Sequence, residues 1–187
     1  MIYILDNFLP KDMLDEFLSD DSEFLPYETP KKTFWAKMPS EQFNQYVIDR
    51  IEEFEGKEIK NIFSFFREAK KGQDNDWRIH NDTIIFGEQP DRAIVLFMES
   101  EENDSLNGTA FWSHKKYGDI YQEQSNEEFN RLLFEDANNQ DLWNLKSVIG
   151  YKQNRLLSYP CNYFHSKYPN EFEQPRRVFV MFYQIKK

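Results

Sequence analysis

The sequence predicts a mostly β protein with flanking helices, folded as a jelly roll of two sheets. From residue 59 onward, short apolar segments with a period of two follow one another at spacings of roughly 8–12 residues, as in sandwiches and barrels. Two segments with a period of three to four precede them. Aromatic residues make up 17% of the chain, 18 of them phenylalanine, and such side chains favour sheets. The simplest arrangement is a jelly roll supported on one side by helices.

The length of 187 residues suits a single domain with a substantial core. We expect residues 1–58 to form an N-terminal helical support and residues 59–187 to form the β core. A short strand is predicted at residues 1–5. Pro10 then opens a helix, where its missing N–H costs nothing. Ser40 is the expected N-cap of a second helix, which Gly56 ends.

The remaining elements follow from alternation and turn chemistry. Residues 22–38 contain two prolines and are expected to be loop or a short edge strand. The run Ser125-Asn126-Glu127-Glu128 is a capping box that begins a short helix. An acidic loop is expected at 99–108. Strands are predicted at residues 62–67, 76–83, 92–98, 109–113, 147–152, 155–159, 163–165 and 177–184.

Charge and cysteine content narrow the class of protein. A net charge of −10 argues against a protein that grips a phosphate backbone, and it favours a cationic or neutral substrate over nucleic acid. The single cysteine, Cys161, excludes an intrachain disulfide framework and is expected to be a small buried residue. The N-terminus lacks a signal-peptide pattern, and no apolar run approaches ~20 residues. We therefore expect a soluble, cytoplasmic protein without a membrane span.

The predicted strand at residues 76–83 carries two candidate metal ligands. Residues two apart in a strand share a face, so His80 and Asp82 would project side by side, with Asn81 turned away. An imidazole and a carboxylate supply two of the three ligands in the 2-His-1-carboxylate arrangement, which holds non-haem Fe(II) and leaves other positions open. His-x-Asp is frequent by chance, so the prediction depends on a third ligand.

Two further histidines are available. His165 follows an apolar segment, whereas His114 lies among polar residues and is expected in a solvated loop. Shortly after His165 come Arg176 and Arg177, which open the last strand. An arginine at the mouth of a barrel is costly to bury unless it meets an anion, and its planar fork suits a carboxylate. Adjacent strand residues face opposite sides; spacing favours Arg176, and Arg177 is the second choice.

His-x-Asp, a distant His and an Arg about ten residues later resemble the Fe(II)/2-oxoglutarate-dependent dioxygenases. The nearest likeness is to the prolyl-4-hydroxylase-like members of small microbial and phage type, from about Phe63 to Tyr183. Three looser stretches support it, at residues 6–10, 107–112 and 154–160. Many members place Arg-x-Ser at the keto-acid position, where this chain has Arg176-Arg177-Val178. They also often carry a keto-acid-binding Tyr before His-x-Asp; residues 65–68 contain none, so another residue takes that contact or it is absent.

The resemblance implies a double-stranded β-helix, a cupin-like jelly-roll barrel. It implies His80, Asp82 and His165 as the catalytic Fe(II) ligands and Arg176 as the partner of the distal carboxylate of 2-oxoglutarate. With O2, such a centre hydroxylates a protein side chain or small molecule and releases succinate and CO2; ascorbate is a further reductant that the resemblance admits. Asp82, rather than Gly or Ala, argues against a halogenating relative.

Two alternatives stay open from the sequence. One is a jelly-roll binding protein without catalysis, and the other is a cupin-type metalloenzyme that does not use 2-oxoglutarate. The tryptophans Trp77, Trp112 and Trp143 are expected in the core or a pocket wall. Arg78, beside the candidate ligands, is expected on the exterior.

Overall fold

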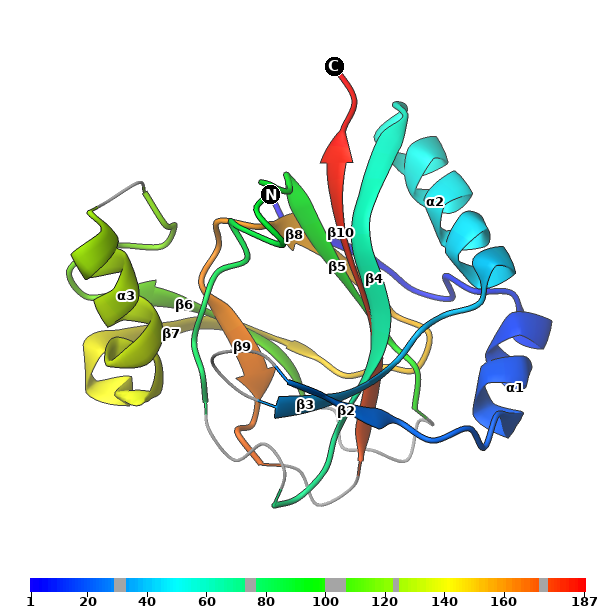
Figure 1. Cartoon of the computed structure of the whole chain (residues 1–187), viewed down its shortest axis with the longest axis horizontal. Helices are drawn as coiled ribbons and strands as arrows, with labels where there is room; N and C mark the ends of the chain where they lie inside the picture. The colour runs from blue at the N-terminus through cyan, green and yellow to red at the C-terminus, as the bar shows by residue number, and fades with distance from the viewer. Residues whose placement is uncertain (29–32, 73–76, 100–106, 123–124, 172–174) are drawn as a thin grey trace.

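The computed structural model of the chain describes residues 1–28, 33–72, 77–99, 107–122, 125–171 and 175–187. Two antiparallel sheets face each other, and two helices cover the outer side of the larger sheet (Figure 1). This is the mostly β architecture with flanking helices that the sequence predicts. Most of the acidic loop expected at 99–108, and Asp76 of the candidate metal strand, lie outside the described residues.

Ten strands are described, and all neighbouring pairs are antiparallel. The strands are β1 (Tyr3–Leu5), β2 (Leu25–Glu28), β3 (Thr33–Lys37), β4 (Ile59–Ala69), β5 (Arg92–Phe97), β6 (Gly108–His114), β7 (Trp143–Gly150), β8 (Leu156–Pro160), β9 (His165–Tyr168) and β10 (Arg176–Ile185). The larger sheet has the order β1-β8-β5-β10-β4-β3-β2, and the smaller has β7-β6-β9. The helices are α1 (Lys11–Ser19), α2 (Glu41–Glu55) and α3 (Asn126–Phe134).

Helices α1 and α2 lie where the sequence predicts them. The Ser40 side chain accepts a hydrogen bond from the Phe43 amide at 3.1 Å, and Gly56 ends α2 in the left-handed conformation. Both helices pack on the outer face of the larger sheet, where a buried apolar cluster includes Phe179 and Met181 of β10. None of the described helices has the length and apolarity needed to cross a membrane.

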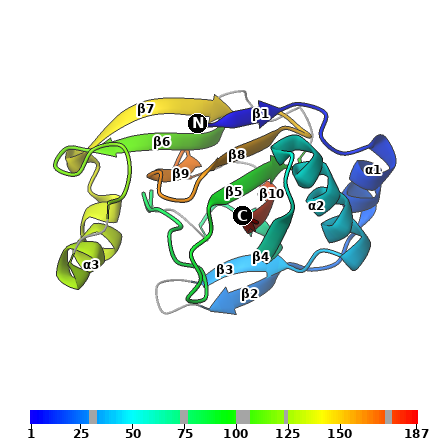
Figure 2. The same ribbon diagram turned by 90° about the horizontal axis from the view of Figure 1, so that it is seen from above.

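Strict alternation along β10 sends the intervening residues to the other face. Val178, Val180 and Phe182 belong to a second buried cluster that joins the inner face of the larger sheet to Phe111 of β6. Side chains with a period of two therefore separate a helix-facing core from an inner face directed at the smaller sheet. Helix α3 lies beyond the smaller sheet, on the opposite side of the molecule from α1 and α2 (Figure 2).

The tryptophans and the cysteine lie as expected. Trp112 and Trp143 are buried in a third cluster with Leu132 of α3, and Trp77 packs against Trp112 edge to face. Cys161 is buried. Each of these side chains therefore serves packing.

The predicted strands differ from the structure in several places. Strand β7 spans Trp143–Gly150, where the sequence predicted residues 147–152. Residues 22–38 contain two strands, β2 and β3, which extend the larger sheet past β4. Strand β9 begins at His165, whereas the prediction ended a strand there. The prediction of a strand at 76–83 is wrong for the described part, residues 77–83, because His80 makes only an isolated bridge to His165. Positive φ angles at Arg78 and Phe86 interrupt extended backbone on both sides of that bridge.

Candidate metal centre and adjoining cavity

The connection between β4 and β5 carries His80 and Asp82 and is fixed by backbone hydrogen bonds. The His80 amide donates to the His165 carbonyl at 3.0 Å, and the His165 amide donates to the His80 carbonyl at 2.8 Å. The Asp82 amide donates to the Cys161 carbonyl at 2.8 Å. These bonds hold His80 and Asp82 in extended register with the segment that leads into β9. The two-residue spacing therefore works as predicted although the segment is not a regular strand.

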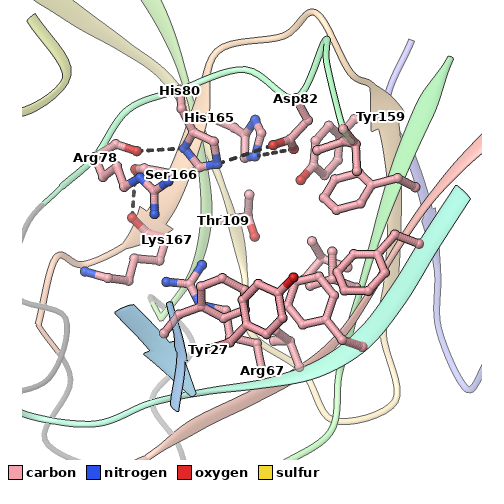
Figure 3. Close-up of a pocket in the computed structure, with 18 of the residues that line it drawn as sticks. Tyr27, Arg67, Arg78, His80, Asp82, Thr109, Tyr159, His165, Ser166 and Lys167 are labelled. Atoms are coloured by element: carbon pink, nitrogen blue, oxygen red, sulfur yellow. Dashed lines mark hydrogen bonds and ion pairs between the residues drawn. The ribbon is translucent and has the colours of Figure 1, made fainter. Parts of the chain in front are cut away.

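His80, Asp82 and His165 meet at one end of a cavity (Figure 3). The Asp82 carboxylate lies between the two rings, with Oδ1 3.6 Å from His80 Nε2 and Oδ2 3.2 Å from His165 Nε2. One candidate ligand atom from each residue lies within 4.8 Å of the others. Asp82 and His165 are buried, and His80 is partly exposed toward the cavity. Such a cluster could hold a metal ion.

Backbone carbonyls orient both imidazoles. His80 Nδ1 lies 2.7 Å from the Arg78 carbonyl oxygen, and His165 Nδ1 lies 3.1 Å from that of Tyr163. Because a carbonyl oxygen only accepts, each Nδ1 carries a hydrogen and donates it. Each Nε2 faces Asp82, and an Nε2 that carries no proton offers its lone pair to a metal. This is the usual outer-shell arrangement of metal-binding histidines.

Burial and the neighbouring histidine together set the charge states of His80 and Asp82. Burial, followed by the nearby charge of His165, lowers the pKa of His80 to about 3, so its ring is neutral near pH 7. Burial on its own raises the pKa of Asp82, but the attraction of His165 and its hydrogen bond outweigh this, and the net shift is downward. A neutral imidazole beside an ionised carboxylate is the donor state that binds a divalent cation.

The cavity has a volume of about 420 Å³ and lies between the two sheets. Its wall across from the candidate ligands is largely apolar and comes from alternate residues of β3, β4 and β10. The apolar residues of these strands that line it are Phe34, Phe63, Phe65, Val178, Val180 and Phe182. A cavity of this size and character suits a small molecule.

The paired arginines at the start of β10 point to opposite sides of the sheet. Arg176 is buried and lines the cavity, and its guanidinium lies 3.4 Å from both the Gly108 carbonyl oxygen and Thr109 Oγ1. Arg177 points away, and its Nε lies 2.8 Å from Glu68 and 3.3 Å from Glu99. The first-choice arginine of the sequence analysis therefore lies in the cavity wall, and the second choice is engaged elsewhere.

Three further cations line the cavity and were missed by the sequence analysis. They are Arg67 of β4, Lys167 of β9 and Arg78, which was expected on the exterior. Alternation could have identified Arg67, since it is in phase with Phe63 and Phe65 on the inner face of β4. Arg78 lies in irregular backbone, where alternation does not apply. Lys167 lies in β9, but the sequence analysis ended a strand at His165 and so did not place Lys167 on any face.

His114 lies away from this cavity, and the prediction of a solvated loop residue is wrong. It is the buried last residue of β6, with Nε2 3.3 Å from Asp136 Oδ2 and Nδ1 accepting a hydrogen bond from the Lys116 amide at 3.1 Å. Its ring also packs against Trp143. Burial lowers the pKa of His114, although Asp136 acts in the opposite direction.

Solved structures with the same fold include alpha-ketoglutarate-dependent enzymes and enzymes solved with 2-oxoglutarate bound. The epimerase SnoN of nogalamycin biosynthesis aligns with 98% of this chain and 78% of its own, with a TM-score of 0.65 and 9% identity. A prolyl-4-hydroxylase from Pseudomonas putida aligns with 100% of this chain and 93% of its own, with a TM-score of 0.57 and 13% identity. HygX from Streptomyces hygroscopicus was solved with nickel, 2-oxoglutarate and hygromycin B. It aligns with 99% of this chain and 83% of its own, with a TM-score of 0.62 and 9% identity.

At these identities the likeness establishes the fold, the jelly-roll barrel expected from the sequence. No protein-family model and no curated protein matches the sequence.

Proposed function

We propose that this protein is an Fe(II)- and 2-oxoglutarate-dependent oxygenase that hydroxylates a small molecule or a protein side chain. The observation that carries the proposal is the arrangement at the cavity. Two histidines and an aspartate converge at one end of the cavity, and the buried Arg176 also lines it. Structural neighbours with this fold use a keto acid, and one was solved with nickel and 2-oxoglutarate bound.

The donor set fits Fe(II). In this proposal His80 and His165 would bind through Nε2 and Asp82 through a carboxylate oxygen, leaving positions for the keto acid and O2. The carbonyls of Arg78 and Tyr163 would keep both rings in the required tautomer. Iron with 2-oxoglutarate and O2 supplies, when bound, the oxidising chemistry that turns a substrate C–H into C–OH while the keto acid becomes succinate and CO2.

Arg176 is the residue we assign to the distal carboxylate of the keto acid. A buried guanidinium is stabilised by a bidentate carboxylate, and the Gly108 carbonyl and Thr109 Oγ1 accept from one of its NH2 groups and restrict its orientation. Tyr159 is the tyrosine we assign to the contact for which residues 65–68 offer none. It lines the cavity 4.7 Å from the His165 ring, and burial raises its pKa well above the ordinary value, so its hydroxyl stays able to donate.

Conversion of 2-oxoglutarate to succinate tests the proposal. Wild-type protein with Fe(II) should form succinate and consume O2. The rate of succinate formation should fall at least about 100-fold in His80→Ala and in Asp82→Ala, because each variant lacks a metal ligand. Asp119→Asn is a matched control, because Asp119 is exposed and pairs only loosely with Lys146, 3.7 Å away.

The same measurements separate the alternatives. Wild-type protein that binds neither iron nor 2-oxoglutarate would contradict the proposal and favour a jelly-roll binding protein. Metal binding without any affinity for 2-oxoglutarate, unchanged when Arg176 and Arg177 are both replaced, would favour a cupin-type enzyme that does not use the keto acid.

A further inference from the structure

We infer that Asn138 positions His80 for metal binding from outside the cavity. The inference rests on the proposed function and extends it to a residue that is not among those lining the cavity. Asn138 is the last residue of the short 3₁₀ helix η1 (Asp136–Asn138), which follows α3. Two hydrogen bonds join η1 to the residues directly before His80, and these two bonds carry the inference.

The orientation of the His80 ring depends on the Arg78 carbonyl oxygen, which lies 2.7 Å from Nδ1 (Figure 3). If this carbonyl pointed elsewhere, the neutral ring could turn or carry its hydrogen on Nε2 instead of Nδ1. An Nε2 that carries a hydrogen has no lone pair to offer a metal. The direction of the Arg78 carbonyl therefore determines whether His80 can serve as a ligand.

Arg78 adopts a backbone conformation that its surroundings must hold. Its φ is 43°, in the left-handed region, which costs a residue with a side chain about 1–2 kcal/mol. Arg78 and Ile79 lie outside the regular strands, and His80 forms only an isolated bridge, so no continuous ladder fixes this stretch. A conformation of this kind persists where other parts of the structure determine it.

Helix η1 holds the peptide groups on both sides of the Arg78 Cα. The Arg78 amide donates to Asn138 Oδ1 at 2.7 Å, and the Ile79 amide donates to the Ala137 carbonyl at 2.9 Å. The Ile79 N–H and the Arg78 carbonyl belong to one planar peptide group and point in opposite directions. The bond to Ala137 on one side therefore directs the carbonyl toward His80 on the other. The bond to Asn138 fixes the preceding peptide group, so together they restrict φ and ψ of Arg78.

Helix η1 is itself anchored by buried contacts. The Asp136 carboxylate lies 3.3 Å from His114 Nε2 and 3.6 Å from Arg131 Nε of α3. The Asp136 carbonyl accepts a hydrogen bond from Trp143 Nε1 at 2.8 Å. Asp136, His114 and Trp143 are all buried. These contacts attach η1 to β6, α3 and β7, so the smaller sheet provides a fixed base from which Asn138 reaches Arg78.

Nickel binding to three variants tests the inference. Asn138 is exposed, so Asn138→Ala removes the acceptor without disturbing the core and should raise the Ni²⁺ dissociation constant about 5- to 10-fold, as measured by isothermal titration. Asn138→Asp keeps a side-chain oxygen at the same place and should stay within about twofold of wild type. Asn139→Ala is the matched control, because the exposed Asn139 accepts from the Asp141 amide rather than from the Arg78 amide.

The tautomer of the His80 ring distinguishes positioning from a general loss of structure. Long-range proton–nitrogen NMR spectra of metal-free protein at pH 8 show which ring nitrogen carries the hydrogen. In wild type, His80 and His165 should carry it on Nδ1, whereas His114, whose Nδ1 accepts from a main-chain amide, should carry it on Nε2. Asn138→Ala should move His80 toward a mixture of both tautomers. His165 should not change, because its acceptor is the carbonyl of Tyr163, in another segment.

An unchanged His80 tautomer in Asn138→Ala would overturn the inference. A loss of nickel affinity in Asn139→Ala or Asn138→Asp equal to that in Asn138→Ala would also overturn it, because neither of these variants lacks the acceptor for Arg78. Melting curves identify the variants that are folded and can be compared.

The proposed function is tested separately by the wild-type protein. Wild type that binds no Ni²⁺ would contradict the proposed metal centre. The tautomer measurement uses metal-free protein, so it still decides in that case whether Asn138 orients the His80 ring.

Discussion

His80 and His165 are partners in one isolated β-bridge, and each amide donates to the carbonyl of the other. Their rings lie 4.4 Å apart between centroids, with the Asp82 carboxylate in contact with both. Two residues far apart in the sequence are thus held together by main-chain hydrogen bonds.

Metal binding should raise the melting temperature of the wild-type protein. A cation that binds the folded state stabilises it by about 2.7 kcal/mol at a hundred times its dissociation constant, which corresponds to roughly 5–10 °C for a chain of this size. Adding Ni²⁺ to chelator-treated protein, followed by differential scanning fluorimetry, measures the shift. Asp82→Ala should abolish it. An equal shift in that variant would place the cation elsewhere.

Replacing Arg176 should impair 2-oxoglutarate binding specifically. Truncating one partner of a buried charge pair costs about 2–5 kcal/mol, so Arg176→Gln should raise the dissociation constant of 2-oxoglutarate about 30-fold or more, as measured by isothermal titration. The 2-oxoglutarate affinity of Arg176→Lys should lie between those of wild type and Arg176→Gln, because the ammonium group keeps the charge but lacks the planar fork of the guanidinium.

Arg177→Gln is the matched control for Arg176→Gln. Its affinity for 2-oxoglutarate should stay within about threefold of the wild-type value. The control is expected to fold because Lys70 Nζ, 2.6 Å from the second carboxylate oxygen of Glu68, keeps that buried acid paired. A loss in Arg177→Gln equal to that in Arg176→Gln would contradict the assignment of the two arginines.

His114 should make the fold less stable in mild acid. Because burial lowers its pKa in the folded state, the unfolded chain takes up a proton first as the pH falls through the ordinary histidine value near 6.5. Asp136 opposes this shift, while Arg131 and Lys116 add to it. The free energy of unfolding should therefore decline below about pH 6.5, by at most about 1.4 kcal/mol per pH unit from this residue.

Urea unfolding at several pH values, in chelator, compares wild type with His114→Gln. The other two histidines contribute equally to both proteins, so the slopes should differ only through His114. Parallel slopes between pH 7 and 5 would rule out a titrating role for the buried ring.

Gly108→Ala should destabilise the sheet that supports Arg176. A Cβ at this position would lie 2.0 Å from the backbone oxygen of Ile149, so the β6–β7 pairing must shift. Overpacking of this kind costs about 1–3 kcal/mol. Chemical denaturation measures the loss, and 2-oxoglutarate titration should show weaker binding because the Gly108 carbonyl accepts from Arg176. Unchanged stability would mean that the two strands tolerate the displacement.

The sequence predicts elements well where local periodicity decides them. Pro10, Ser40 and Gly56 mark the ends of α1 and α2, and alternation in β10 separates Arg176 from Arg177. It fails where the backbone is set by distant partners. Ile79 and the residues around it look like a strand, yet the segment lacks a continuous neighbour and pairs only at His80.

The cavity wall shows the same limit. Lys167 reaches the cavity only because β9 pairs with β6 opposite Thr109. Phe34 reaches it because the larger sheet extends past β4. Both depend on sheet order, which one sequence does not contain.

The imidazole orientation depends on the carbonyls of Arg78 and Tyr163, which are main-chain atoms. Their side chains can therefore change without removing the acceptors that fix the two rings. The apolar wall of the cavity comes from other segments, β3, β4 and β10. The orientation of the candidate ligands and the shape of the cavity wall are thus determined by separate atoms of the chain. Substitutions can therefore change the side chains of the cavity wall without removing the main-chain carbonyls that orient His80 and His165.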